Sequence, residues 1–209
     1  MANIADCAFA VAKDELDKLN GAVAKTDRQD GYEFHYKWHI KKGEEEHEVE
    51  HYHASYFANV GESKTIAWYK VDGEKIAEKV YTKKYSEQGF VMTNEPRERL
   101  ADKEFSNGYM VDWAMLNSCP YDSDTNVQEY DDHITVYFGG RWDFPTAVED
   151  FLNKSEIRWQ GAGCEDGMGW STIDLGNYDF GLRIERERCD EDDDDGKPMY
   201  YHFVEDQTK

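Results

Sequence analysis

Four β-prone runs separated by short turns fill residues 32–85, and they constrain the fold more than any other part of the chain. The runs are YEFHYKWHI, HEVEHYHASYF, KTIAWYKV and EKIAEKVYTKKY, and KKGEE separates the first two. Asp72-Gly73 separates the last two, and Asp-Gly between β-prone runs favours a hairpin. We therefore expect an antiparallel meander, although residues 74–85 also fit a helix.

The rest of the chain alternates between strand and helix patterns. The further predicted strands are residues 3–12, 133–138, 156–163, 171–181 and the hairpin pair 182–189 and 198–204. One predicted helix begins at Lys13, with Asp14 as N-cap, and another spans residues 145–154. Residues 96–101 fit a short helix, and residues 109–116 fit either a helix, which we favour, or a buried strand. This order indicates one α+β domain, residues 1–209, with a mostly antiparallel sheet and two or three helices.

Negative charge is concentrated in the C-terminal half. The formal net charge is −21, and residues 105–209 hold 24 Asp/Glu against 8 Lys/Arg. Such a segment repels nucleic acid and acidic membranes and attracts basic protein surfaces. The expected partner is therefore a basic protein, with no direct nucleic-acid or membrane binding. The candidate partner-binding residues are Asp122, Asp124, Asp131, Asp132, Glu165, Asp166, Asp190, Glu191, Asp192, Asp193, Asp194 and Asp195.

Residues 47–51, HEVEH, match the H-E-x-x-H pattern of zinc proteases. That chemistry needs a helix, on which two imidazoles four residues apart converge on one ion. Here EEE precedes the motif, and His53 continues a period-2 pattern. On a strand, His47, Val49, His51 and His53 share one face, and Glu48 and Glu50 share the other. We expect the strand, and a zinc hydrolase using His47, Glu48 and His51 stays as an alternative.

Other motifs are incomplete, so we expect no cofactor and no dedicated metal site. Residues 122–126 match half of a calcium loop, but Val127 replaces the required glycine and His133 the required glutamate. Residues 161–169 are glycine-rich without a phosphate-loop lysine. The four cysteines are widely spaced, no apolar run reaches membrane length, and we read no secretion signal, which together favour a cytoplasmic location in a host cell.

Residues 138–171, FGGRWDFPTAVEDFLNKSEIRWQGAGCEDGMGWS, combine an aromatic entry to a helix, an apolar strand and a Glu/Gly-rich turn. This segment resembles the YubB-like ferredoxin-like family of plasmids and phages. The resemblance implies a split β-α-β core made by residues 1–25 and 130–209, with residues 26–129 as an inserted meander. It also implies an origin in a mobile element, and it brings no catalytic residues. The residues that carry it are Phe138, Trp142, Pro145, Glu165, Gly167 and Gly169.

Together these features predict a non-enzymatic phage or plasmid protein that inhibits a host defence protein by nucleic-acid mimicry. Carboxylates on a rigid sheet would stand in for phosphates in the groove of a CRISPR effector or restriction enzyme. Two alternatives stay open, namely the zinc hydrolase and a structural phage protein whose acidity serves solubility only.

Overall fold

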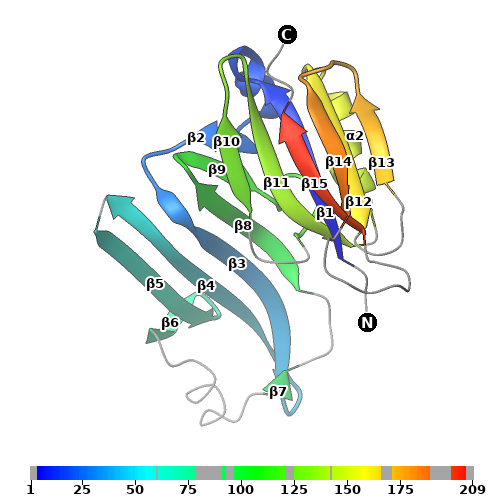
Figure 1. Cartoon of the computed structure of the whole chain (residues 1–209). Coiled ribbons are helices and arrows are strands. Elements are labelled where there is room, and N and C mark those ends of the chain that lie inside the picture. Colours follow the sequence, from blue (N-terminus) through cyan, green and yellow to red (C-terminus); the bar gives the residue numbers. More distant parts are fainter. Residues whose placement is uncertain are drawn as a thin grey trace. The chain divides into compact units, whose positions relative to one another are not determined.

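The computed structural model in Figure 1 shows a mostly antiparallel β-sheet protein, with two short helices in the part of the chain that it describes. It describes residues 4–59, 61–78, 91–92, 97–120, 125–141, 143–165, 171–188 and 199–205. The prediction of a mostly antiparallel sheet with few helices is confirmed. The chain divides into two compact units, which we call unit 1 (residues 1–24 and 116–209) and unit 2 (residues 25–115).

Unit 1 is built on a sheet in the order β10-β11-β1-β12-β13. Its central strand β1 pairs antiparallel with both β11 and β12, so these two run parallel to each other. Helix α2 lies between them in the chain, and parallel strands need such a crossover connection. The strands and the helix are β1 (Ile4–Ala12), β10 (Asn126–Glu129), β11 (His133–Arg141), α2 (Thr146–Lys154), β12 (Trp159–Glu165) and β13 (Ser171–Gly176).

Small residues on one face of this sheet allow a hairpin to pack closely against it. Strands β14 (Leu182–Arg188) and β15 (Met199–Glu205) form that hairpin, as the sequence predicts. Leu182 packs with Ala8 and Ala162, both of which are buried. Alanines at alternate positions of β1 share one face, so the hairpin packs against the face of the strand that has small side chains.

Larger side chains line the other face of the unit 1 sheet. Phe9 is fully buried and contacts Phe138 edge-on at 5.9 Å between ring centroids. Phe138 contacts Phe144, which immediately precedes α2. Burying one such aromatic side chain stabilises the fold by about 1.5–3 kcal/mol. The two faces of β1 therefore join the sheet to the helix layer and to the hairpin.

Unit 2 is a long antiparallel sheet in the order β9-β8-β3-β4-β5-β6. The short strand β2 (Val23–Lys25) spans the sequence boundary between the two units. The predicted meander is confirmed over β3, β4 and β5, and Asp72-Gly73 forms the turn before β6, which is a strand. A two-residue strand, β7 (Val91–Met92), also pairs with β3. The remaining bounds are β3 (Gln29–Lys42), β4 (Glu45–Asn59), β5 (Glu62–Val71), β6 (Glu74–Glu78), β8 (Glu98–Ser106) and β9 (Tyr109–Asp112).

The short helix predicted at residues 96–101 is wrong, and for residues 109–116 the buried-strand alternative, not the favoured helix, holds over Tyr109–Asp112. Residues 98–106 form β8, which is hydrogen-bonded to β3, and Tyr109–Asp112 form β9. Asn107 and Gly108 join them with φ angles of 52° and 79°, the left-handed pair that a tight hairpin turn requires.

The predicted helix at Lys13 is shorter than expected. It is a single 3-10 segment, η1 (Lys13–Leu19), and it ends at Asn20 in the left-handed conformation. The N-cap is Ala12 rather than Asp14, because the segment begins one residue before Asp14. The Asp14 carboxylate accepts a hydrogen bond from Arg158.

Candidate functional site

Unit 1 carries most of the negative charge. It holds 27 Asp/Glu and 10 Lys/Arg, a net charge of −17, whereas unit 2 holds 18 and 14, a net charge of −4. The uneven charge along the sequence is therefore a property of one structural unit. A field of this size attracts a positively charged partner to unit 1.

The predicted partner-binding residues fall into three groups. Asp131 and Asp132 lie side by side in the exposed turn between β10 and β11. Glu165 is the last residue of β12, and its backbone lies opposite Ala5 of β1. Asp132 lies at the other end of β1, because the next residue in the chain is opposite Ala12. Seven residues of strand separate these two ends by about 23 Å. Asp122, Asp124, Asp166 and residues 190–195 lie outside the described residues.

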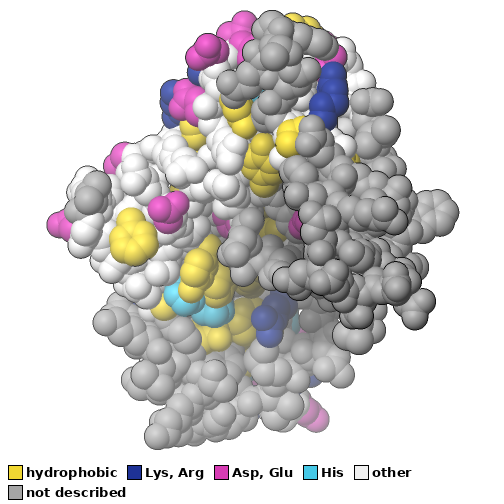
Figure 2. Space-filling view, in the orientation of Figure 1, with side chains coloured by type: hydrophobic (Ala, Val, Ile, Leu, Met, Phe, Trp, Pro, Cys, Tyr) yellow, Lys and Arg dark blue, Asp and Glu magenta, His cyan; other side chains and the backbone are white. Residues whose placement is uncertain are grey.

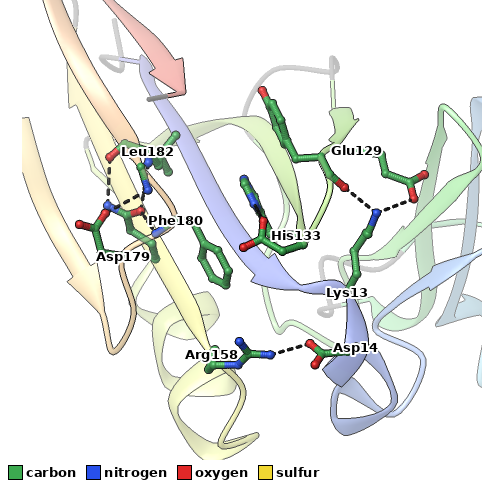
Figure 3. Close-up of polar contacts among 12 residues, drawn as sticks. Lys13, Asp14, Glu129, His133, Arg158, Asp179, Phe180 and Leu182 are labelled. Carbon is green, nitrogen blue, oxygen red and sulfur yellow. Dashed lines mark hydrogen bonds and ion pairs between the residues drawn. The ribbon is translucent and has the colours of Figure 1, made fainter. Parts of the chain in front are cut away.

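The Asp132 carboxylate is held by the neighbouring imidazole. Asp132 Oδ1 lies 2.6 Å from His133 Nδ1, and this contact lowers the pKa of Asp132. His133 is itself buried between two rings, with centroids 4.7 Å from Tyr130 and 4.8 Å from Phe180 (Figure 3). Asp132 is nevertheless 68% exposed, so its charge is fixed in place and faces solvent.

Further carboxylates surround this turn. Lys13 Nζ bonds Glu129 Oε1 at 3.1 Å, and Arg158 Nη2 bonds Asp14 Oδ1 at 2.6 Å (Figure 3). The pKa of Glu15 is lowered, first by the backbone N–H of Arg158 and then by Lys18. We call residues 13–19, 129–132 and 156–158 the acidic end.

The acidic end has seven carboxylates against three Lys/Arg side chains. Sequence reasoning identified only Asp131 and Asp132 there. The pairing of Ala12 with His133, and of Val11 with Trp159, brings the three segments together. That pairing is long-range, so no local pattern could have identified the remaining carboxylates, Asp14, Glu15, Asp17, Glu129 and Glu156.

The HEVEH motif lies on β4, so its strand interpretation is confirmed. Along a strand, His47 and His51 are about 13 Å apart, too far to share one ion. His47 Nδ1 lies 2.7 Å from Asp72 Oδ2, and Glu48 on the opposite face pairs with Lys37 at 3.1 Å. Within the described ranges, no group of three His, Cys, Asp or Glu side chains is placed to hold a metal ion.

His51 and its neighbours form an aromatic face on unit 2 that sequence reasoning did not identify as a site. Tyr32, Phe34, Tyr36 and Trp38 alternate along β3, so their side chains lie on the same side as His51 and His53 of β4. Figure 2 shows histidine side chains beside hydrophobic ones on this part of the molecule. Burial is the main cause that lowers the pKa of His51 to about 4, so this imidazole is neutral near pH 7.

No family model, curated protein or solved structure matches the chain. No helix in the described residues is both long enough and apolar enough to cross a membrane. The fold and the acidic end thus define a class, an acidic protein of mostly antiparallel sheet.

Proposed function

We propose that the protein is a non-enzymatic inhibitor that occupies the nucleic-acid groove of a host defence protein through unit 1. The observation that carries this proposal is the net charge of −17 on one unit of a β-rich scaffold. A groove that binds phosphates is lined with Lys and Arg, and it attracts a surface of fixed carboxylates in the same way. The expected target is a CRISPR effector or restriction enzyme in the cytoplasm of a host cell.

The acidic end is suited to such a contact because its carboxylates are both held and exposed. Asp14 and Asp132 are 74% and 68% exposed, although each has a hydrogen-bonded cationic or imidazole partner. A side chain that is already positioned loses less conformational entropy when a partner binds. The carboxylates could therefore exchange their own cations for those of a partner at low cost.

We further propose that unit 1 has a ferredoxin-like core and that the chain is related to the YubB-like family of plasmids and phages. The order β10-β11-β1-β12, with α2 joining β11 to β12, supports the ferredoxin-like assignment. In this assignment η1 stands in the place of the first helix, and unit 2 is the inserted meander.

The proposal is tested by removing charge from one unit at a time. Converting residues 190–195 to Asn and Gln removes six carboxylates from unit 1. The matched control converts six exposed carboxylates of unit 2, namely Glu44, Glu45, Glu46, Glu62, Glu74 and Glu98. Both variants have the same net charge, so a difference between them reports position rather than total charge.

The measurement is inhibition of DNA binding by purified CRISPR effectors and restriction enzymes from one host. We expect the unmodified protein to inhibit one of them, the unit 1 variant to lose inhibition by at least about tenfold, and the control to keep it. Raising the salt concentration should weaken inhibition, because solvent-exposed charges are screened. Equal loss in both variants would show that the acidity acts only through total charge, as in a structural protein kept soluble by it.

A smaller variant tests the acidic end itself. Asp17, Asp131 and Glu156 are exposed, and their conversion to Asn, Asn and Gln leaves the ion pairs of Asp14, Glu15 and Glu129 in place. We expect this variant to inhibit less well than a variant with Glu44, Glu45 and Glu46 all converted to Gln. Equal inhibition by the two triple variants would exclude the acidic end from the contact.

A further inference from the structure

His133 is a buried imidazole with a carboxylate and two aromatic rings as its neighbours. It begins β11 opposite Ala12 of β1, and it is only 6% exposed. Its ring is stacked on Tyr130, within 14° of parallel, and the Phe180 ring is tilted by 30° to it (Figure 3). The short contact between Nδ1 and Asp132 Oδ1 completes this setting.

These three neighbours favour the protonated form of the imidazole. A carboxylate at hydrogen-bond distance stabilises an imidazolium, and the faces of aromatic rings attract a cation. Burial of His133 acts in the opposite direction, since it favours the neutral form. The Asp132 carboxylate, however, reaches solvent and keeps its charge, because its hydrogen bond with His133 lowers its own pKa.

The wider surroundings of His133 are also negative. The elements packed around it are η1, the turn between β10 and β11, the residues before β12, and the segment that leads into β14. The phenols of Tyr130 and Tyr178 add no charge at neutral pH. Among the described residues of these elements, the charged side chains are eight carboxylates and four cations, namely Asp14, Glu15, Asp17, Glu129, Asp131, Asp132, Glu156 and Asp179 against Lys13, Lys18, Arg158 and Arg183.

The residues of this side-chain pair also hold the backbone of the turn. The N–H of Tyr130 donates to the carbonyl oxygen of His133 at 2.9 Å, and the N–H of Lys13 donates to that of Asp132 at 3.0 Å. A change in the charge of His133 therefore acts on the turn at the position where the turn is attached to β1 and η1.

We propose that His133 is a buried imidazolium at neutral pH and that its pair with Asp132 is a pH-sensitive switch, which holds the β10–β11 turn while His133 is protonated. A neutral imidazole can still donate one hydrogen bond, but charge assistance makes such a bond about twice as strong. Because the folded state favours the proton, the stabilisation is complete in mild acid and is lost as the pH rises through the titration of His133. The switch needs no partner, so it is independent of the function proposed above.

The test is an NMR titration of the imidazole resonances of the full chain, from about pH 5 to about pH 9. We expect His133 to titrate at least about one pH unit above His39, which is 50% exposed. Asp132→Asn should lower the His133 midpoint by at least about one unit. Asp131→Asn is the matched control, because it removes the same charge from the adjacent exposed residue, and it should move the midpoint less than half as far. A His133 midpoint below that of His39, or equal effects of the two variants, would overturn the proposal.

Amide hydrogen exchange tests the effect on the turn. Protection factors, which correct for the intrinsic pH dependence of exchange, should fall by about tenfold at Tyr130 and Lys13 as the pH rises from the His39 midpoint to one unit above it. The control amide is Thr26 of unit 2, which donates to the Gly108 carbonyl oxygen at 2.8 Å and should keep its protection. Constant protection at Tyr130 and Lys13 would overturn the switch.

Discussion

The Gln160 side chain hydrogen-bonds the backbone of Leu182 in both directions. Its Nε2 donates to Leu182 O at 3.0 Å, and its Oε1 accepts from Leu182 N at 3.1 Å and from Phe180 N at 2.9 Å. Gln160 is only 4% exposed, so water does not compete for these groups. One side chain of β12 therefore fixes where β14 begins, and with it the hairpin on the alanine face of unit 1.

Replacing Gln160 with Met should destabilise unit 1. The substitution keeps the shape but leaves three buried backbone groups without their partners, and each such group costs about 1–3 kcal/mol. We expect a loss of at least about 2 kcal/mol in the free energy of unfolding. Urea unfolding measures it, and amide hydrogen exchange at Phe180 and Leu182 locates it.

Gln128→Met is the matched control for this prediction. Gln128 lies in β10 of the same sheet but is exposed, and its Oε1 accepts only from the Tyr130 hydroxyl among the described contacts. Its substitution should change the free energy of unfolding by less than about 0.5 kcal/mol. Similar losses in both variants would mean that the Gln160 bonds do not hold β14.

The comparison of sequence with structure shows which signals were strong. The alternation around Val49, with imidazoles on one side and carboxylates on the other, predicted β4 despite the protease-like motif. Asn107-Gly108 is an equally strong hairpin signal that sequence analysis did not use, and it would have identified β9. Leu100 and Ala101 favour a helix by propensity, but pairing of β8 with β3 outweighs that preference.

The acidic end was less predictable for a different reason. Asp132 is adjacent in sequence to Asp131, but Asp14 reaches Arg158 across 144 positions. Such contacts depend on the register of β1 against its two neighbours, which periodicity does not specify. The aromatic face was not predicted as a site, because aromatic residues at alternate positions are equally typical of a buried strand face.

Gly176→Ala should destabilise unit 1 more than its positive φ alone explains. Gly176 has φ +106°, and an added Cβ would lie 2.2 Å from the carbonyl oxygen of Trp159. That oxygen accepts hydrogen bonds from the N–H groups of Asn177 and Tyr178, so it cannot move away freely. We expect a loss of more than about 2 kcal/mol, which thermal or urea unfolding would measure.

Gly21→Ala separates the clash from the backbone strain. Gly21 also has a positive φ, +88°, but an added Cβ meets nothing within 4 Å. Its substitution should cost only about 1–2 kcal/mol, the penalty for a left-handed L-residue. If Gly176→Ala costs no more than Gly21→Ala, then β13 moves away from Trp159 without loss.

Unit 2 should lose stability as the pH falls from about 6.5 to about 4. Burial lowers the pKa of His51 to about 4 in the folded state, whereas an unfolded histidine titrates near its ordinary pKa of 6.5. In this window the unfolded chain binds the extra proton, so acid favours unfolding by up to about 1.4 kcal/mol per pH unit. Urea midpoints measured across this window would detect the slope.

The His51→Phe variant should flatten that slope. Phenylalanine keeps the stacking that His51 makes on Tyr69, with ring centroids 4.2 Å apart, but it cannot bind a proton. His39→Gln is the control, because His39 is 50% exposed and its loss should leave the slope unchanged. A slope that persists in the phenylalanine variant would assign the pH dependence to other groups.

Cys7 and Cys164 should resist alkylation that Cys119 undergoes. Cys7 is 1% exposed, and burial, followed by the nearby Asp143 carboxylate, raises its pKa, so little reactive thiolate forms. Cys164 is also buried, whereas Cys119 is exposed.

With iodoacetamide, peptide mass analysis should show Cys7 and Cys164 reacting on the order of 100-fold more slowly than Cys119, because the reagent reaches them only after local opening. In urea the three rates should converge. Fast labelling of Cys7 in the native protein would mean that β1 is not the buried central strand of unit 1.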